Sequence, residues 1–266
     1  MSEARTVVLK IGGSVITDKG SELVARTQAI DRLADEVQRA NVKNLIIVHG
    51  GGSFGHPSAQ RNSLIEGFKN PSQIAGFAET HHYMTVLNGL VMDSLIVHNI
   101  PAVSIAPSSC IVTEDKRIKT FEDTPLRMLS KTGFLPVLYG DTVMDTKLGF
   151  TILSGDQLVS TIAMKFNAQR IIMGVDVDGL YDADPKAEKT ARIFSHLTLA
   201  ELGKLQGKLG KSMACDVTGG MFGKIAELLP VVEKGIPVTI VNATKPNYVY
   251  KSLKGEKVEA TIIEKE

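Results

Sequence analysis

Cysteine is scarce in this sequence, with Cys110 and Cys215 alone among 266 residues and no CxxC spacing. This argues against a disulfide framework or a zinc site and fits a reducing compartment such as the cytoplasm. An excess of one charge sign is also lacking, since 30 basic and 29 acidic residues leave a net charge of +1, which argues against a general nucleic-acid binder. No segment reaches the ~20 apolar residues of a membrane span, and the N-terminus has no apolar region of signal-peptide type. We therefore expect a cytoplasmic protein with no nucleic-acid or membrane partner.

The chain has ample length for a hydrophobic core, and no linker, repeat or low-complexity stretch divides it. Short apolar runs alternate with segments of helical spacing along its whole length. This alternation predicts an α/β fold with a mostly parallel sheet, and we expect a single domain over residues 1–266. The expected strands are 6–11, 45–48, 102–105, 135–138, 170–175 and 238–241, with hairpins at 111–118 and 143–153, a final strand, and helices at 28–39, 71–98, 123–129, 154–166, 219–234 and near the C-terminus. The expected helix caps are Ser72 and either Ser154 or Asp156.

A glycine triplet at 50–52 follows the expected strand 45–48, and His56 comes four residues later. Glycines at the end of a buried strand leave backbone N–H groups uncovered, so an anion can approach them closely. The histidine adds a titratable donor at the same place. This stretch predicts a site for a phosphate that reacts. The alternative is a structural glycine turn with an ordinary surface histidine at His49 or His56.

A second glycine motif follows the first expected strand, where Lys10 precedes Gly12, Gly13 and Ser14, with Lys19 shortly after. The motif matches neither GxxxxGK[ST] nor GxGxxG. Its N–H groups and lysines are suited to phosphate oxygens, although a plain strand–turn explains the local pattern equally well. A lysine within a buried strand favours the phosphate interpretation, because burying an unpaired ammonium group is costly.

Two later segments carry related chemistry. Residues 174–181 form an acidic, turn-rich stretch, continued by Asp182, Asp184 and Pro185. Such a stretch can hold a nucleotide ribose or orient a metal indirectly, but it lacks the glutamate of an EF-hand. Residues 216–223 place two glycines at an expected helix N-terminus, where the helix dipole attracts anions, and Lys224 follows one turn beyond Gly220. Ordinary capped turns explain the first segment equally well and the second segment better.

Taken together, the four motifs favour phosphoryl transfer, which depends on positioning and charge neutralisation. Two negative charges ~4 Å apart repel by ~4 kcal/mol at an effective dielectric of ~20, so two phosphates brought together need several cations. Lys10, Lys19, Lys224 and Mg²⁺ can supply them. A catalytic loop of the protein-kinase kind is absent from the sequence. A phosphate acceptor needs no general base because its second pKa is ~6, so the sequence favours an anionic acceptor over an alcohol.

These segments resemble the amino acid kinase superfamily, on residues 10–14, the glycine-rich strand end, 176–181 and 216–221. Within it the chain resembles the isopentenyl phosphate kinases, on residues 50–57, 139–141 and 152–156, and the resemblance covers nearly the whole chain. It implies a three-layer αβα sandwich, usually a homodimer. The implied activity is ATP-dependent, Mg²⁺-assisted phosphorylation of isopentenyl phosphate to isopentenyl diphosphate, in the archaeal-type mevalonate pathway of isoprenoid biosynthesis.

The resemblance also implies roles for individual residues, with acceptor binding in the N-terminal part and ATP binding from about residue 170 onward. The implied catalytic residues are His56, Lys19 and Lys10. The implied nucleotide-binding residues are Lys10, Gly12, Gly13, Ser14, Gly52, Asp176, Gly179, Gly220 and Lys224. Those on the substrate side are Gly51, Gly55, His56 and Gly155. Metal-ligating side chains are not expected.

An apolar stripe at helical spacing, with Phe77, Thr80, Met84 and Leu87, is a candidate pocket for the prenyl tail, although such a stripe is also typical of plain core. Residues 206–211 look like a loop that the motifs do not explain. The alternatives are another small-molecule kinase of the superfamily, such as fosfomycin, uridylate or acetylglutamate kinase, or a nucleotide-binding regulator without turnover.

Overall fold

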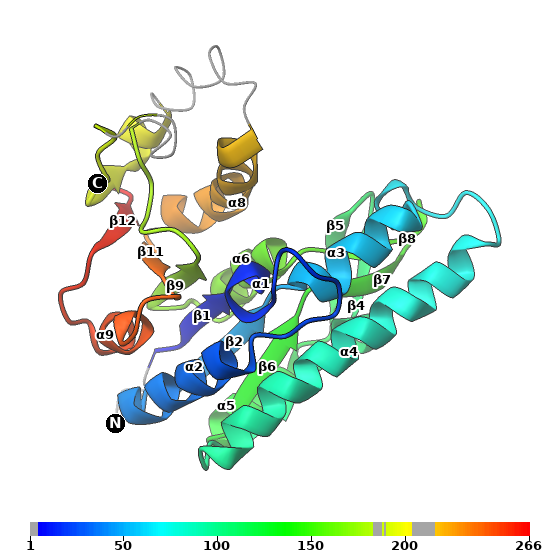
Figure 1. Cartoon of the computed structure of the whole chain (residues 1–266), viewed down its shortest axis with the longest axis horizontal. Helices are drawn as coiled ribbons and strands as arrows, with labels where there is room; N and C mark the ends of the chain where they lie inside the picture. Colours follow the sequence, from blue (N-terminus) through cyan, green and yellow to red (C-terminus); the bar gives the residue numbers. More distant parts are fainter. Residues whose placement is uncertain (1–4, 183–187, 189, 204–215) are drawn as a thin grey trace.

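A computed structural model describes residues 5–182, 188, 190–203 and 216–266, and of residues 216–222 it gives only the helix that they form. An eight-stranded sheet runs through the molecule in the order β10-β12-β11-β9-β1-β2-β6-β3 (Figure 1). Neighbouring strands are parallel except for β11 and β12. The strands are β1 (Val7–Ile11), β2 (Leu45–His49), β3 (Ala102–Ser104), β6 (Leu135–Tyr139), β9 (Arg170–Val175), β10 (His196–Thr198), β11 (Val238–Asn242) and β12 (Ala260–Glu264).

Helices cover both faces of this sheet, which explains why β1, β2 and β6 are buried along their whole length. One face packs against α2 (Thr27–Ala40), α4 (Gln73–Val97) and α9 (Tyr248–Lys254). The other packs against α5 (Thr124–Thr132), α6 (Gly155–Lys165) and α8 (Asp216–Glu233). The three-layer αβα sandwich with a mostly parallel sheet is therefore confirmed.

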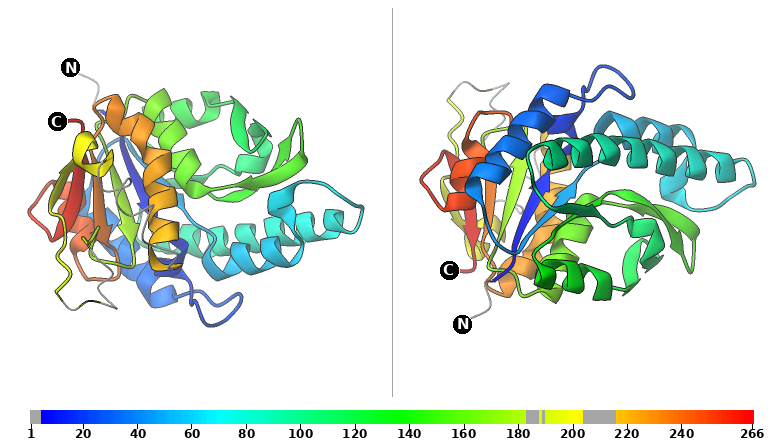
Figure 2. Two further views of the ribbon diagram at one scale, coloured as in Figure 1. Left: turned by 90° about the horizontal axis from the view of Figure 1, so that it is seen from above. Right: turned by 90° about the horizontal axis from the view of Figure 1, so that it is seen from below.

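A second sheet of four strands, in the order β5-β4-β7-β8, was not expected from the sequence. Its strands are β4 (Ile111–Glu114), β5 (Arg117–Phe121), β7 (Asp141–Asp145) and β8 (Gly149–Leu153). Both predicted hairpins are present, and a parallel pairing of β4 with β7 joins them. Figure 2 shows this small sheet and α4 projecting to one side of the central sheet, away from the C-terminal elements.

The segment after β2 corrects the sequence interpretation, which described a glycine loop. Residues Gly52–Arg61 form helix α3, which begins directly after the strand and contains Pro57. Glycine and proline are weak helix formers, so the local sequence gives little sign of a helix. Burial of Phe54 and Ala59 and packing against α4 stabilise it instead. A four-residue helix, α1 (Gly13–Ile16), similarly follows β1.

Helix boundaries otherwise lie close to the expected ones. Ser154 caps α6 by accepting a hydrogen bond from the Gln157 N–H, whereas Ser72 precedes α4 without a side-chain capping bond. The described part of α8 begins at Asp216, three residues earlier than expected. Among the described residues, no helix is both long and apolar enough to cross a membrane.

Candidate active site

The candidate site lies at the carboxyl end of β1, in the middle of the central sheet. Strand β1 has β2 on one side and β9 on the other, which makes the carboxyl ends of these strands a topological switch point. The three strands end in register at Ile11, His49 and Gly174–Val175. Ligands of open α/β sheets bind beyond such strand ends, so the glycine motifs at 12–13 and 50–52 occupy the expected place.

The two glycine motifs touch each other. A Cβ atom on Gly13 would lie 2.1 Å from the Gly52 nitrogen, and one on Gly52 would lie 2.0 Å from the Thr17 hydroxyl oxygen. Gly52 also has a φ of +49°, a left-handed conformation that favours glycine. Both positions therefore exclude a side chain, and the two motifs form one continuous backbone surface rather than two separate turns.

A charge cluster of one buried and two partly buried side chains lies beside this surface. Lys10, only 3% exposed, places its Nζ 2.9 Å from Oδ1 of Asp156, and Lys224 places its Nζ 2.9 Å from Oδ2 of the same carboxylate. Asp156 comes from the first turn of α6 and Lys224 from α8, and these two helices pack together on the face of the sheet toward which Lys10 points. The partner that a buried lysine requires is therefore Asp156.

Charge coupling within this cluster is visible in the pKa values of its members. Burial lowers the pKa of Lys10, while Asp156 acts in the opposite direction. Burial alone would raise the pKa of Asp156, but Lys10 and Lys224 outweigh it and hold that pKa below the usual range. Two ammonium groups thus share one carboxylate, which leaves an excess positive charge to attract phosphate oxygens.

His56 lies in α3, and the charges of the same cluster shift its pKa. Loss of hydration lowers its pKa most, followed by repulsion from Lys224 and Lys10, while Asp156 opposes them. The ring is still open to solvent. A neutral imidazole at pH 7 next to two cations has an N–H that can donate to a phosphate oxygen, which is the role expected of this residue.

Lys19 lies on the other side of the glycine surface, on the segment between α1 and α2. Its Nζ is 2.5 Å from Oδ2 of Asp176, directly after β9, and the Ser14 side chain also hydrogen-bonds this carboxylate. Burial would raise the pKa of Asp176, but these contacts lower it. The lysine side chain is 66% exposed, so it can exchange this partner for a phosphate.

The residues expected on the substrate side gather between α3 and α4. The Met84 sulfur would be 2.8 Å from a Cβ on Gly51 and 3.0 Å from one on Gly55, so Met84 fills the space beside both glycines. Thr80 is buried and hydrogen-bonds Ser58 of α3. Phe77 lies further along α4, with its ring 5.2 Å from that of Phe150 in β8. Gly155 begins α6, against the His49 carbonyl.

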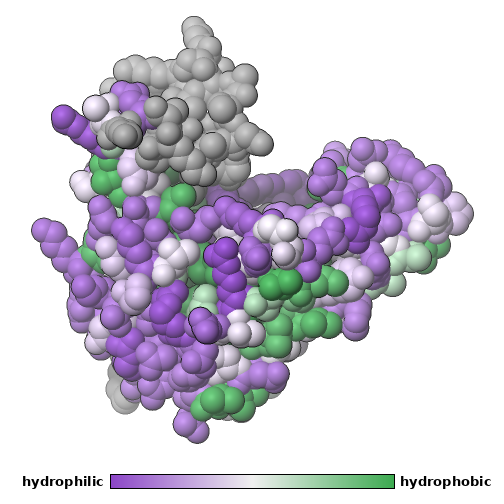
Figure 3. Space-filling view, in the orientation of Figure 1, coloured by the Kyte–Doolittle hydropathy of each residue, from purple (hydrophilic) through white to green (hydrophobic). Residues whose placement is uncertain are grey.

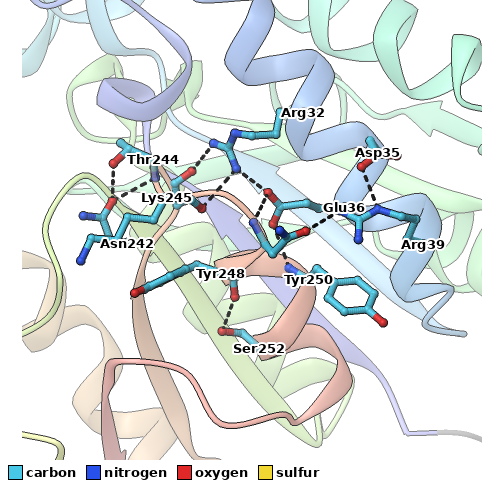
Figure 4. A network of polar contacts seen from close by, with 12 residues as sticks. Arg32, Asp35, Glu36, Arg39, Asn242, Thr244, Lys245, Tyr248, Tyr250 and Ser252 are labelled. Carbon is cyan, nitrogen blue, oxygen red and sulfur yellow. Dashed lines mark hydrogen bonds and ion pairs between the residues drawn. The ribbon is translucent and has the colours of Figure 1, made fainter.

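A polar network that the sequence did not reveal links α2 to the segment between β11 and α9 (Figure 4). Glu36 of α2 is fully buried, forms an ion pair with Arg32, and accepts hydrogen bonds from the backbone N–H groups of Asn247 and Tyr250. These bonds fix the first turn of α9 and the segment before it. Lys245 of that segment forms an ion pair with Asp178.

Gly179, the neighbour of Asp178, has no room for a side chain. A Cβ on it would lie 2.5 Å from the Thr261 hydroxyl of β12. The loop after β9 is thus packed against the C-terminal strand. Gly220 lies in the first turns of α8, whereas Asp184, Pro185 and residues 206–211 lie outside the described residues.

Asp156 is the main site residue that sequence reasoning missed, because it was noted as a possible helix cap and within the segment 152–156 but was given no role in the site. The cost of burying Lys10 demanded a carboxylate partner, and this was the signal that could have led to it. Lys245 had no comparable signal. Within the described ranges, no group of three or more His, Cys, Asp or Glu residues is arranged to hold a metal ion.

A parallel sheet with helices on both faces, anion-binding backbone at its switch point and two lysines on one carboxylate are features of a small-molecule phosphotransferase. The sequence matches the amino acid kinase family over residues 5–242, and the chain belongs to that family.

Within this family, the chain is similar over nearly its whole length to isopentenyl phosphate kinases. The enzyme of that name from Methanothermobacter thermautotrophicus is 40% identical over 265 residues, 97% of this chain and 98% of that protein. The one from Methanocaldococcus jannaschii is 36% identical over 97% of this chain and 98% of that protein. A solved isopentenyl phosphate kinase structure superimposes with a TM-score of 0.85 at 37% identity, covering 97% of this chain and 99% of the other.

Proposed function

We propose that this protein transfers the γ-phosphoryl group of ATP to the phosphate of isopentenyl phosphate, giving isopentenyl diphosphate. The observation that carries the proposal is the Lys10–Asp156–Lys224 cluster, which lies beside the contact between the two glycine motifs. Burial and the two lysines of this cluster also lower the pKa of His56. This arrangement brings several cations and N–H donors to one place, which is what two adjacent phosphates require. The named relatives supply the identity of the acceptor.

In the proposed mechanism, the segment 12–14, the N–H of Gly52 and Lys10 hold the ATP phosphates, while Gly51 and His56 hold the acceptor phosphate. Lys224 neutralises charge on the nucleotide side, and Lys19 leaves Asp176 to stabilise the transferring group. Transfer is direct and in line, since the acceptor oxygen is already anionic. A trapped phosphorylated His56, or retention of configuration at a chiral γ-phosphate, would contradict direct transfer.

We propose Mg²⁺ as the cation that accompanies ATP. Magnesium usually keeps several waters and binds through one or two carboxylates plus substrate phosphates. Asp176 lies on the nucleotide side and suits that role, whereas Asp156 is already shared by two lysines. When bound, the ion would neutralise charge on the phosphate oxygens.

A substrate panel tests the proposal directly. ADP release is measured with isopentenyl phosphate, fosfomycin, UMP and N-acetylglutamate, each with ATP and Mg²⁺. We expect turnover with isopentenyl phosphate at a kcat/KM at least ~100-fold above the others, because a buried site built for one group rejects analogues strongly. Comparable or faster turnover of another acceptor would replace isopentenyl phosphate, and ATP binding without any turnover would indicate a regulator.

The prenyl tail is proposed to lie along Met84 and Thr80 toward Phe77. The Phe77 ring packs on Phe150 and would block the far end of this path. The two rings belong to a small apolar cluster with Ala59, Leu64 and Ile152. A ring at the far end of an apolar pocket limits the length of chain that fits. This assignment predicts that Phe77 sets the upper limit of tail length.

Replacing Phe77 with alanine is expected to raise kcat/KM for a ten-carbon prenyl phosphate relative to isopentenyl phosphate by ~10-fold or more, because the space of the ring becomes available. The ratio is measured by competition, with thermal unfolding as a check because Phe77 is partly buried against Phe150 and its loss costs some stability. Ile74→Ala, an exposed apolar position on the same helix, is the control. An unchanged ratio in a folded Phe77→Ala protein would place the tail elsewhere.

We further propose that the protein is a cytoplasmic homodimer and that α4 lies in the interface. Hydrophobic side chains gather over the middle of α4 and the adjoining loop (Figure 3), where Leu23, Val24, Tyr83 and Val86 line a groove of about 520 Å³. Large exposed apolar surfaces of this kind mark interaction sites. Sedimentation should give twice the chain mass, and Val86→Glu should shift the protein toward monomer. A monomeric wild-type protein at micromolar concentration would exclude the dimer.

A further inference from the structure

His49, the last residue of β2, has no role in the mechanism above. Its side chain is fully buried, and both ring nitrogens lie near polar atoms. Nδ1 is 3.1 Å from the Gly50 carbonyl oxygen, and Nε2 is 3.3 Å from the atom placed as Oδ1 of Asn88 on α4, whose Nδ2 lies 2.7 Å from the Ser104 hydroxyl. The ring also stacks on Tyr139, with centroids 5.4 Å apart. A buried histidine with this many fixed contacts holds one orientation.

The protonation state of this ring follows from its partners. A carbonyl oxygen only accepts hydrogen bonds, so Nδ1 must carry a hydrogen to bind Gly50. Burial lowers the pKa of His49, and no carboxylate contacts the ring among the described residues, so the imidazole is neutral and Nε2 is an acceptor. The Asn88 amide then donates to Nε2 and accepts from the Ser104 hydroxyl, a reversal of oxygen and nitrogen that leaves atom positions unchanged.

The Gly50 carbonyl is the significant partner, because it belongs to the peptide that joins Gly50 to Gly51. A trans peptide is planar, and its C=O and N–H point in opposite directions, so fixing the carbonyl also fixes the Gly51 N–H. Neither glycine has a Cβ to restrict rotation of this peptide. The Gly50 N–H is anchored on the Ile11 carbonyl at 2.9 Å, and His49 supplies the second anchor.

His49 also lies where the two glycine motifs approach the segments that contain Gly140 and Gly155. Its own carbonyl accepts a hydrogen bond from Gly140 and lies against Gly155, and a Cβ on Gly50 would be 2.8 Å from the Gly13 nitrogen. A rotated Gly50 peptide would therefore disturb the surface that both phosphates are proposed to share. An apolar residue at position 49 could fill the same volume but could not hold the carbonyl.

We propose that His49 is a positioning residue, whose side chain holds the Gly50 carbonyl and thereby directs the Gly51 N–H toward the phosphate of the acceptor. The inference rests on the proposed function only in taking the anion at Gly51 to be the acceptor phosphate. Asn88 and Ser104 lock the ring from the opposite side, which links the backbone of the site to α4 and β3.

Three substitutions at this position separate positioning from packing. In His49→Asn the side-chain amide reaches the place of Nδ1 and keeps the bond to Gly50. In His49→Gln it reaches the place of Nε2 and keeps only the bond to Asn88, whereas His49→Leu keeps neither. We expect the KM for isopentenyl phosphate to rise ~10-fold in the Gln and Leu proteins and ~3-fold or less in the Asn protein, in keeping with the loss of one hydrogen bond.

Thermal midpoints of the three proteins are measured alongside the kinetics. If all three lose stability and activity together without the expected order in KM, His49 is a structural residue and the proposal is wrong. A wild-type enzyme that prefers another acceptor overturns the proposed substrate instead, and the same three variants are then compared on that acceptor.

Nuclear magnetic resonance of the ¹⁵N-labelled wild-type protein tests the geometry without any variant or turnover. We expect the His49 ring to be neutral at pH 6, with the hydrogen on Nδ1 and none on Nε2. A hydrogen on Nε2 alone would leave the Gly50 carbonyl without its donor and would overturn the proposal, whereas a hydrogen on Nδ1 keeps the bond.

Discussion

Replacing His56 with alanine is expected to lower kcat by two to three orders of magnitude while leaving the fold intact. The ring stands on α3 under the influence of Lys10 and Lys224, and its lowered pKa keeps it a neutral donor at pH 7. A hydrogen-bond donor that contacts developing charge in the transition state contributes ~10²–10³ to kcat. Because the ring is open to solvent, its removal should cost little stability. Steady-state kinetics with isopentenyl phosphate and thermal unfolding measure the two effects separately.

The conservative variants sharpen this test. His56→Gln places an amide N–H near the position of Nε2 and should retain part of the activity, while the shorter His56→Asn should be as poor as alanine. Gln60→Ala, an exposed position one turn further along α3, is the matched control and should leave kcat unchanged. A His56→Ala enzyme with near wild-type turnover would remove this residue from the mechanism.

Much of the central sheet was predictable because its strands are buried on both faces. The continuous apolar run at β2 and the run interrupted only by Lys10 at β1 have few other structural solutions. The four-stranded sheet was not predictable in the same way. Its hairpins are local and were expected, but the parallel pairing of β4 with β7 joins segments about 30 residues apart, and no local pattern encodes such a contact.

The candidate site shows the same division. One glycine triplet, two glycine pairs and the lysines near them are visible in the sequence, so Lys10, Lys224 and His56 could all be proposed before the structure. Helix α3 was hidden by Gly55 and Pro57, because the packing that stabilises it comes from α4. The pairing of Lys10 with Asp156 joins a strand to a helix 146 residues later, and only the fold brings them together.

The shared carboxylate makes Asp156 the second position where we expect a large effect. Asp156→Asn keeps the shape but removes the charge between Lys10 and Lys224, whose ammonium groups each lie 2.9 Å from it. The lysines would then repel each other and lose their fixed positions. Misplacing two charges that act on the transferring group should lower kcat/KM for ATP by ~10²–10³. The matched control is Glu227→Gln on α8, which breaks the surface ion pair with Arg117.

The pH dependence distinguishes this electrostatic role from a general loss of structure. Burial already lowers the pKa of Lys10, and Asp156 is the group that raises it, so removing the carboxylate should lower that pKa further. Lys10 must be charged to bind phosphate, and activity is therefore lost as pH rises through its pKa. The alkaline limb of the kcat/KM profile should move to lower pH in Asp156→Asn and stay in place in Glu227→Gln. An unmoved limb in a folded Asp156→Asn enzyme would mean that Lys10 is held by other groups and that the carboxylate has no part in setting its charge.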